Sequence, residues 1–249
     1  MMKHIQARNQ NGVLTLSMSR AEKKNALTQE MYLTLALALE DAGRDDSVRV
    51  VVLRGTPTVF SSGNDIQDFA DDGSGQEKLA SVRFMKAVTS LQKPIVAAVC
   101  GYAVGIGATV LLHCDYVVAS EDARIRFPFV DLGLCPEFGS TLLLPALVGQ
   151  QKASEWMLLG SFVLAGEAQK AGLVNRVLPN DMVFEEVDSI ARSLAKKPPA
   201  ALSATRQLLK SASRELIESR IQKERDIFQA LRATEDAQAI FNGFLSRSR

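Results

Sequence analysis

The 249-residue sequence contains few of the residues that most often carry nucleophilic and metal chemistry. Its three cysteines, Cys100, Cys114 and Cys135, lie in apolar segments without a Cys-x-x-Cys pair, which favours buried, reduced thiols over a catalytic cysteine. Its two histidines are His4, expected at a frayed N-terminus, and His113, for which a core or cap role is expected. Because no ligand cluster surrounds either histidine, we expect no metal site.

Three common catalytic and binding motifs are also missing. No G-x-S-x-G occurs, which argues against a Ser-His-Asp hydrolase, and no G-x-x-x-x-G-K-[ST] occurs, which argues against a phosphate-binding P-loop. Gly101, Gly105 and Gly107 do not form G-x-G-x-x-G, the fingerprint of a dinucleotide-binding fold. A nicotinamide enzyme would therefore need another kind of site.

Long apolar runs and an excess of one charge are absent as well. The longest apolar stretch, residues 103–112, is interrupted by glycines and is shorter than the roughly 20 residues that cross a bilayer. Lys and Arg number 29 against 28 Asp and Glu, a net charge of +1, so no overall field attracts nucleic acid or a membrane. The N-terminus lacks a signal-peptide core. We expect a cytoplasmic protein with neither a membrane nor a nucleic acid as partner.

The elements that the sequence does contain alternate between strand and helix and then become helical. Runs of β-branched residues predict strands over 13–18, 48–53, 95–99, 116–119 and 173–178. Helical patterns cover 77–91, 105–113, 141–147, 152–159, 166–171, 183–195, 200–211, 214–232 and 235–245, with a polar loop at 71–75. Thr28 is the expected N-cap of a helix whose apolar stripe is Met31, Leu35 and Leu39.

This order predicts an α/β core followed by an α-helical C-terminal region. The Pro198-Pro199 step marks the boundary between a core over residues 1–197 and a helical region over 198–249. A turn inside one domain is equally consistent with the two prolines.

Two glycine segments about forty residues apart indicate the chemistry. Phe60-Ser61-Ser62-Gly63-Asn64-Asp65-Ile66 follows the strand predicted over 48–53, and Gly101-Tyr102-Ala103-Val104-Gly105-Ile106-Gly107 follows the strand predicted over 95–99. Glycine permits sharp turns and close approach of the backbone to a ligand. Two such turns at neighbouring strand ends can direct two N–H groups at one oxygen, the geometry of an oxyanion hole.

Further motifs occur in order around these segments: Lys23-Lys24-Asn25-Ala26-Leu27, Lys93-Pro94, Asp115, Leu132-Gly133-Leu134 and Ala171-Gly172-Leu173-Val174. From Val13 onward the chain thus resembles the crotonase superfamily, which includes the enoyl-CoA hydratases and isomerases. The resemblance implies a fold of repeated ββα units with an α-helical C-terminal region that forms trimers or hexamers. It also implies acyl-CoA thioester substrates, with no metal and no cofactor beyond the coenzyme A of the substrate.

The resemblance assigns catalytic roles to three residues. The oxyanion donors would be the backbone N–H groups of Asn64 and Ile106, the latter standing where most members have glycine. Glu137, in a Pro-Glu step, matches the single catalytic glutamate of the peroxisomal-type Δ3,Δ2-enoyl-CoA isomerases, while Thr109 and Phe129 occupy the two glutamate positions of hydratases. The prediction is isomerisation of 3-enoyl-CoA to 2-trans-enoyl-CoA by one glutamate. Alternatives are a hydratase, a thioester hydrolase or an RNA-binding member that uses Lys78, Arg83, Lys86 and Lys93.

Substrate contacts are implied near the two glycine segments. The expected substrate-binding residues are Lys24, Ala26, Ser62, Gly63, Asp65, Ile66 and Gly105, with Lys24 directed at the CoA phosphates. Structural roles remain open for several of these positions. Glu137 could stabilise the start of a helix, Asn64 and Asp65 are common turn residues, and Lys24 could be a surface lysine. Asp131 is interpreted as structural.

Overall fold

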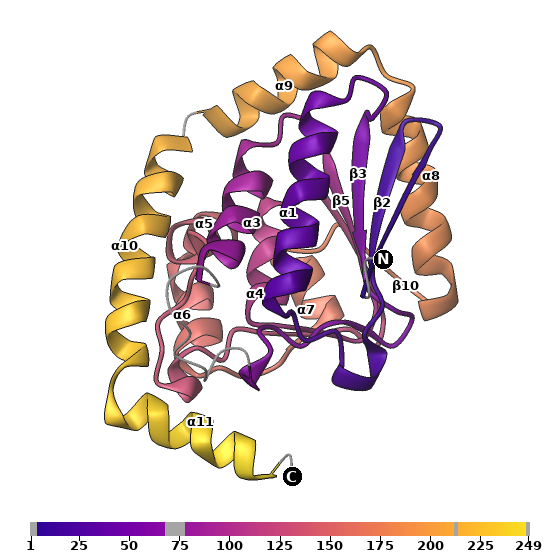
Figure 1. Ribbon diagram of the computed structural model, residues 1–249. Helices are drawn as coiled ribbons and strands as arrows, with labels where there is room; N and C mark the ends of the chain where they lie inside the picture. Colours follow the sequence, from indigo (N-terminus) through magenta and orange to yellow (C-terminus); the bar gives the residue numbers. More distant parts are fainter. Residues whose placement is uncertain (1–3, 68–77, 212–213, 248–249) are drawn as a thin grey trace.

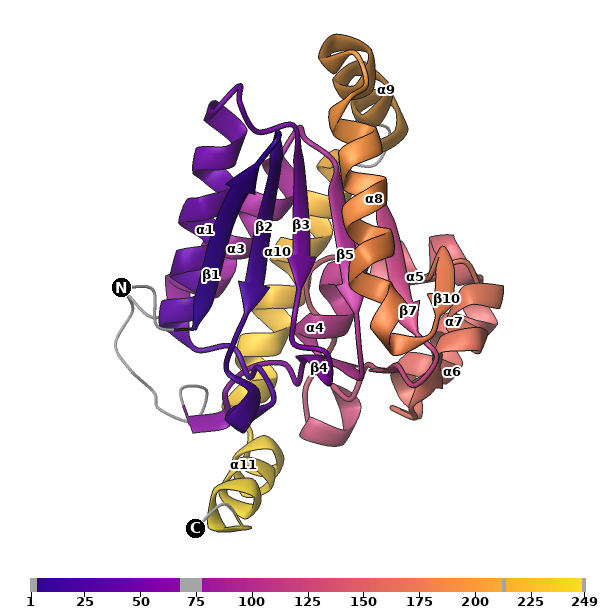
Figure 2. The same ribbon diagram turned by 90° about the vertical axis from the view of Figure 1, so that its right-hand side faces the viewer.

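A computed structural model describes residues 4–67, 78–211 and 214–247 of the chain. A mostly parallel sheet runs through its centre (Figures 1 and 2), with the order β1-β2-β3-β5-β7-β10 in the described residues. Only β1 and β2 pair antiparallel there. The strands are β1 (Ile5–Gln10), β2 (Val13–Met18), β3 (Val50–Arg54), β5 (Ile95–Val99), β7 (Tyr116–Ser120) and β10 (Arg176–Leu178).

A second, smaller sheet lies beyond the ends of the large one, in the order β4-β6-β8-β9. Its strands are β4 (Val59–Ser61), β6 (Tyr102–Val104), β8 (Arg124–Arg126) and β9 (Val163–Leu164). Repeatedly, a strand of the large sheet leads into a strand of the small sheet and then towards a helix, as in β5, β6 and α4 (Ile106–Thr109). The ββα repeat that the family resemblance implied is confirmed.

Helices cover both faces of the large sheet. α1 (Gln29–Arg44) and α3 (Lys78–Ser90) lie on one face, and α8 (Val183–Ala195) lies on the other (Figure 1). The β-branched run of β3 therefore alternates between two cores: Val51 and Leu53 pack in the cluster of α1 and α3, whereas Val50 and Val52 pack in the cluster of α8. Burial on both faces explains why this strand has no polar side.

Short helices, most of them in the second half of the core, connect these elements. They are η1 (Ala21–Lys23), η2 (Val110–His113), η3 (Val130–Leu132), α5 (Ser140–Val148), α6 (Gln150–Leu158), α7 (Ala165–Lys170) and η4 (Asn180–Met182).

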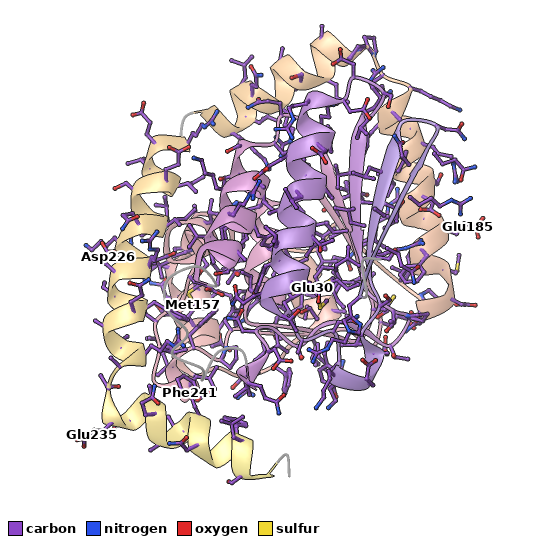
Figure 3. All side chains as sticks on the ribbon, viewed as in Figure 1. Glu30, Met157, Glu185, Asp226, Glu235 and Phe241 are labelled. Atoms are coloured by element: carbon purple, nitrogen blue, oxygen red, sulfur yellow. The ribbon has the colours of Figure 1, made fainter. Side chains whose placement is uncertain are left out.

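Three C-terminal helices, α9 (Pro199–Ser211), α10 (Arg214–Arg232) and α11 (Glu235–Arg247), pass around the outside of the core (Figure 1). Charged side chains such as Glu185, Asp226 and Glu235 point outward (Figure 3), whereas Phe241 of α11 is 2% exposed. The division of the chain at residue 198 stays a prediction. Among the described residues, no helix has both the length and the apolar character needed to cross a bilayer.

Most predicted elements are confirmed within one or two residues, and two expectations are wrong. The Thr28 cap forms, with its side chain accepting from the N–H of Met31. His4 does not lie in a frayed end: its carbonyl accepts from the N–H of Ser19 at 2.9 Å and β1 follows directly. Only Ile5 of β1 is buried, so that strand has no apolar alternation. The strand expected over 173–178 forms only from Arg176, and the loop expected at 71–75 lies outside the described residues.

Candidate active site

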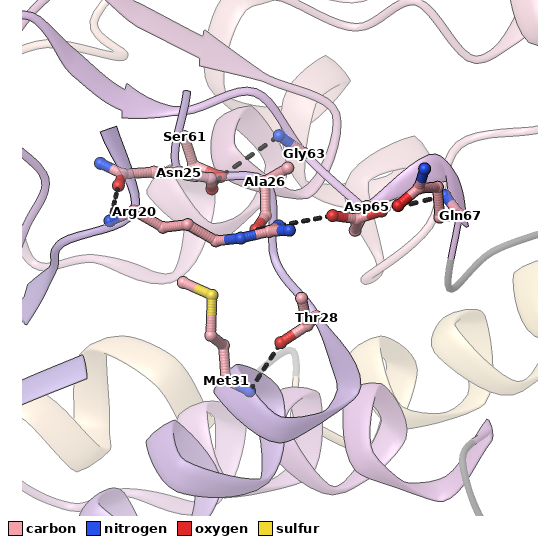
Figure 4. A network of polar contacts seen from close by, with 9 residues as sticks. All are labelled: Arg20, Asn25, Ala26, Thr28, Met31, Ser61, Gly63, Asp65 and Gln67. Carbon is pink, nitrogen blue, oxygen red and sulfur yellow. Dashed lines mark hydrogen bonds and ion pairs between the residues drawn. The ribbon is translucent and has the colours of Figure 1, made fainter. Parts of the chain in front are cut away.

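The first glycine loop is anchored by a buried network around Asn25 (Figure 4). Its amide nitrogen donates to the carbonyls of Val59 at 2.9 Å and Phe60 at 3.1 Å. The hydroxyl of Ser61 donates to the carbonyl of Asn25 at 2.8 Å and accepts from the N–H of Gly63 at 3.2 Å. Side-chain amides and hydroxyls thus satisfy the buried backbone at the point where β4 turns.

An ion pair fixes the far side of the same loop. Arg20 donates to the carbonyl of Ala26 at 2.9 Å and contacts the carboxylate of Asp65 at 2.5 Å, with both side chains largely buried. Asp65 also accepts from the N–H of Gln67 at 2.9 Å. The Asp65 side chain therefore ties the loop to Arg20, and its predicted contact with substrate stays a prediction.

The Asn25 segment and the first glycine loop are paired by backbone hydrogen bonds. The N–H of Ser62 donates to the carbonyl of Lys24 at 3.0 Å, and the N–H of Leu27 donates to that of Gly63 at 2.8 Å. Most of the substrate-binding residues predicted around 24–26 and 62–66 are thereby brought together. The Lys24 side chain is exposed beside this pairing, where it can reach a ligand phosphate or solvent.

Replacing Asn25 with Ala is expected to destabilise the protein by roughly 3 kcal/mol, because several buried backbone groups lose their partner at once. Urea unfolding measures the effect. Asn9→Ala is the matched control, because Asn9 is exposed on β1 and makes one long contact to Ser47. Equal stability of the two variants would show that the network does not support the loop.

The second glycine loop lies directly against the first. β4 and β6 are parallel neighbours, so both loops begin at the carboxyl ends of adjacent strands, on the same side of the small sheet. Gly63 and Gly105 have φ of 95° and 58°, and a Cβ built on Gly105 would stand 3.8 Å from the Cα of Gly63. α4 begins at Ile106. In the described part of the chain, the N–H groups of Asn64 and Ile106 donate to no backbone or side-chain acceptor, which leaves both available to a ligand.

The side chain of Ile106 is turned away from this side of the sheet. It is 1% exposed and lines a small, mainly apolar cavity together with Leu27 and Phe84. Thr109 and Phe129, at the positions where hydratases have glutamates, are 0% and 3% exposed. Neither side chain carries a carboxyl group that could activate water.

Glu137 is a buried carboxyl group with an unpaired oxygen. It is 9% exposed, and its Oε1 has no hydrogen-bond partner among the described residues. Burial raises the pKa of Glu137 from its ordinary value of 4.5 to about 8, and the nearby Glu224 carboxylate acts in the same direction. A buried carboxyl group with a raised pKa is suited to take up and return a proton near neutral pH.

Tyr32 connects the first glycine loop to the surroundings of Glu137. Its hydroxyl donates to Oδ1 of Asn64, its ring lies 5.6 Å from that of Phe84, and it is fully buried. Burial, and secondarily the charge of Glu137, raise the pKa of Tyr32 well above its ordinary value. Sequence reasoning missed this residue, because helix periodicity does not distinguish it from the apolar stripe of α1.

Glu224 is the second residue that sequence reasoning missed. It lies on α10, is 4% exposed and accepts hydrogen bonds from the backbone just after Glu137. Its signal was present in the sequence: Ile217, Ile221, Glu224 and Phe228 follow the spacing of one helix face. A carboxylate in that series is unusual, because charged side chains are seldom buried without partners.

The cysteines are free, but only Cys100 is buried as expected, whereas Cys114 and Cys135 are partly buried; His113 is buried in the core, as expected. Burial raises the pKa of Cys114 to about 12 and that of Cys100 and Cys135 to about 11, so none is a ready thiolate. Burial lowers the pKa of His113 to about 4, and its Nε2 contacts the carbonyl of Phe138 at 2.7 Å.

The remaining acidic residue near the site has a structural contact. Asp131 is exposed and pairs with Arg126 at 2.9 Å. In the described residues, no group of three or more His, Cys, Asp or Glu side chains is placed to hold a metal ion.

The sequence comparisons agree with this geometry. Residues 8–249 match the family model described as enoyl-CoA hydratase/isomerase. The chain belongs to this family. It is 34% identical over 247 residues to 2,3-dehydroadipyl-CoA hydratase of Escherichia coli (strain K12), covering 99% of this chain and 97% of that one.

Other relatives carry isomerase names. The chain is 31% identical to 1,2-epoxyphenylacetyl-CoA isomerase of Escherichia coli (strain K12), covering 99% of this chain and 97% of that one. It is 33% identical to enoyl-CoA delta isomerase 2 of Rattus norvegicus, covering 98% of this chain and 64% of that one. Among solved structures, an enoyl-CoA hydratase/isomerase from Pseudoalteromonas atlantica T6c has a TM-score of 0.94 at 39% identity, covering 98% of both chains. The crotonase fold is thereby shown.

Proposed function

We propose that the protein isomerises 3-enoyl-CoA to 2-trans-enoyl-CoA with Glu137 as its single proton carrier. The thioester oxygen lies between the N–H groups of Asn64 and Ile106. Negative charge develops on that oxygen as a C2 proton leaves, so preorganised donors stabilise the transition state more than the neutral substrate.

One carboxyl group can both remove and return the proton. The Glu137 carboxylate takes a proton from C2, the C2–H electrons form a C1–C2 double bond, and the carbonyl electrons move onto the thioester oxygen, which gives a dienolate that still has its C3–C4 double bond. Glu137 then returns its proton to C4: the thioester carbonyl re-forms, the C1–C2 electrons become the C2–C3 double bond, and the C3–C4 electrons form the new C4–H bond. One buried carboxyl group can serve both carbons if it lies over the plane of the dienolate, and no second acid is needed.

The observation that carries the proposal is the state of Glu137. Its Oε1 is buried without a partner among the described residues, and its pKa is raised to about 8. A purely structural carboxylate would normally have its hydrogen bonds satisfied. The contact of Tyr32 with Asn64 further supports a shared site for Glu137 and the first oxyanion donor.

Hydration of 2-enoyl-CoA is the second candidate, because a relative at 34% identity is named 2,3-dehydroadipyl-CoA hydratase. Thr109 and Phe129 count against it, since water addition by the two-glutamate route needs carboxyl groups at those positions. Thioester hydrolysis has no specific support. RNA binding through the basic residues in and just after α3 is weakened because Arg83 pairs with Glu40 at 2.6 Å and Lys93 donates to two carbonyls.

Product analysis separates the two candidates. With 3-enoyl-CoA substrates of several chain lengths, we expect the conjugated 2-enoyl thioester to appear, and with 2-enoyl-CoA we expect little loss of the conjugated absorbance. Chromatography of the products measures both. Rapid formation of 3-hydroxyacyl-CoA would contradict the proposal and would show that another residue activates water.

The wider properties of the protein are proposed with the same reaction. We infer an acyl-CoA substrate, no cofactor beyond its coenzyme A, a cytoplasmic location, and a homotrimer or hexamer. Light scattering at micromolar concentration tests the assembly, and a monomer would contradict it.

A further inference from the structure

The segment that carries Glu137 packs closely against α10 and α11, the last two helices of the chain. A Cβ built on Gly133 would stand 3.2 Å from the Cα of Ala237 on α11. A Cβ built on Gly139 would stand 3.3 Å from Ile217 and 3.4 Å from Ile221, both on α10. α10 runs alongside α5, the helix that follows the segment (Figure 1). The position of Glu137 therefore depends on a part of the chain far away in sequence.

The backbone turns sharply directly after Glu137. Phe138 has φ of 66° and Gly139 has φ of 72°. A non-glycine residue in this left-handed region costs about 1–2 kcal/mol, so surrounding contacts must hold it there. On one side, the ring of His113 stacks on that of Phe138 with centroids 4.0 Å apart.

Glu224 holds the other side of the turn. Its Oε2 accepts from the N–H of Gly139 at 2.6 Å, and its Oε1 accepts from the N–H of Thr141 at 2.9 Å and from the Thr141 hydroxyl at 2.6 Å. Gly139 is the N-cap of α5 and makes no side-chain cap. The carboxylate of α10 thus supplies the cap from another helix, because unpaired N–H groups at a buried helix start are costly.

The same carboxylate affects the charge of Glu137. Burial raises the pKa of Glu224, while its hydrogen bonds to Thr141 and Gly139 oppose this change. Three donors directed at two oxygens favour the ionised form. In the described residues, the titratable and charged side chains that face Glu137 or its neighbours are Tyr32 of α1, His113 of η2, Cys135 of the same loop, and Arg220 and Glu224 of α10.

We propose that Glu224 is a positioning residue for proton transfer at Glu137, because its carboxylate fixes the backbone turn after Glu137 and places a second negative charge close to it. The kinetic consequences of this proposal rest on the isomerase function proposed above. Its structural part, the hold on Gly139 and Thr141, is independent of the reaction.

The variant Glu224→Gln tests both effects. Gln keeps the size of Glu but lacks its charge. Its NH₂ group is a donor and would face one of the backbone N–H donors, so one of these hydrogen bonds is lost. With 3-enoyl-CoA, we expect kcat to fall about 10- to 100-fold with KM changed less than about threefold. We expect the acidic limb of the kcat/KM profile to move to lower pH by roughly half a unit or more. Glu218→Gln is the matched control, because Glu218 is on the same helix, exposed and paired with Arg214, and its profile should match wild type.

Glu224→Asp separates the effect of the carboxylate charge from the effect of side-chain length. It also serves as the test variant if Glu224→Gln does not fold. Asp keeps the charge but is shorter, so the acidic limb should stay near that of wild type while kcat falls. Wild-type kcat in Glu224→Asp would overturn the positioning role. In Glu224→Gln, the acidic limb of the kcat/KM profile could stay at the wild-type pH while kcat and KM change by similar factors. That result would indicate a merely structural residue and would also overturn the positioning role.

Amide hydrogen exchange gives a readout that needs no activity. In Glu224→Gln, exchange at Gly139 and Thr141 should accelerate at least about tenfold, as expected when a hydrogen-bonded cap is lost, while the amide of Val187 in α8 should be unchanged. Unchanged exchange at Gly139 and Thr141 overturns the proposal. If these amides respond as expected but wild type is inert on every 3-enoyl-CoA, the hold on the turn is supported and the isomerase function fails.

Discussion

Glu137→Gln is expected to lower kcat for 3-enoyl-CoA isomerisation by about 10⁴-fold or more, because the sole group that accepts the C2 proton is lost. Gln is nearly isosteric with Glu, so the fold and acyl-CoA binding should persist. The assay follows the appearance of the conjugated thioester. In wild type, the acidic limb of kcat/KM should lie near pH 8, since the pKa of Glu137 is raised to about 8 and its ionised form is the base.

Asp131→Asn is the matched control for this loss. Asp131 lies six residues earlier, is exposed and pairs with Arg126. Its replacement should change kcat by less than about threefold, as expected for an exposed ion pair. Near-wild-type turnover in Glu137→Gln together with a large loss in Asp131→Asn would assign the base to Asp131 instead.

The same Glu137→Gln variant should be more stable than wild type at alkaline pH. In the unfolded chain Glu137 loses its proton near pH 4.5, whereas in the folded protein it keeps it until about pH 8. The folded state therefore binds more protons between these values, so burial of Glu137 lowers stability progressively as pH rises through that window. Above about pH 8 the full cost applies, with an upper limit of roughly 5 kcal/mol.

Urea unfolding at pH 5, 7 and 9 measures this effect. The difference in unfolding free energy between Glu137→Gln and wild type should be small at pH 5 and should grow by several kcal/mol at pH 9. Glu218→Gln serves as control, because Glu218 is exposed on α10 and its curve should run parallel to that of wild type. Parallel curves for Glu137→Gln would show that Glu137 ionises normally in the folded protein.

The order of the elements was predictable because local chemistry specifies them. Thr28 caps α1 through a contact three residues away, and the β-branched residues of β3 can be satisfied only between two apolar layers. The two- and three-residue strands of the small sheet were not predictable, because they are too short to show a periodicity.

Two parts of the candidate site could be picked out in the sequence. Gly63 and Gly105 predicted the two turns, because each lies in a short contiguous motif, and the family resemblance singled out Glu137 in the Pro136-Glu137 step, although its burial could not be read from the sequence. Tyr32 was hidden within an apolar helix face, although it contacts Asn64. The polar partner of Asp65 was also hidden, because Arg20 lies 45 residues away along the chain.

The sequence by itself determined the order of most strands and helices around the large sheet, the two glycine turns and the presence of Glu137, which we propose as the base. Only the tertiary structure decided how that group behaves. The raised pKa of Glu137 comes from burial and from Glu224, which is 87 residues further along the chain. Desolvation and charge proximity depend on distance in space, and local sequence patterns describe only neighbours along the chain.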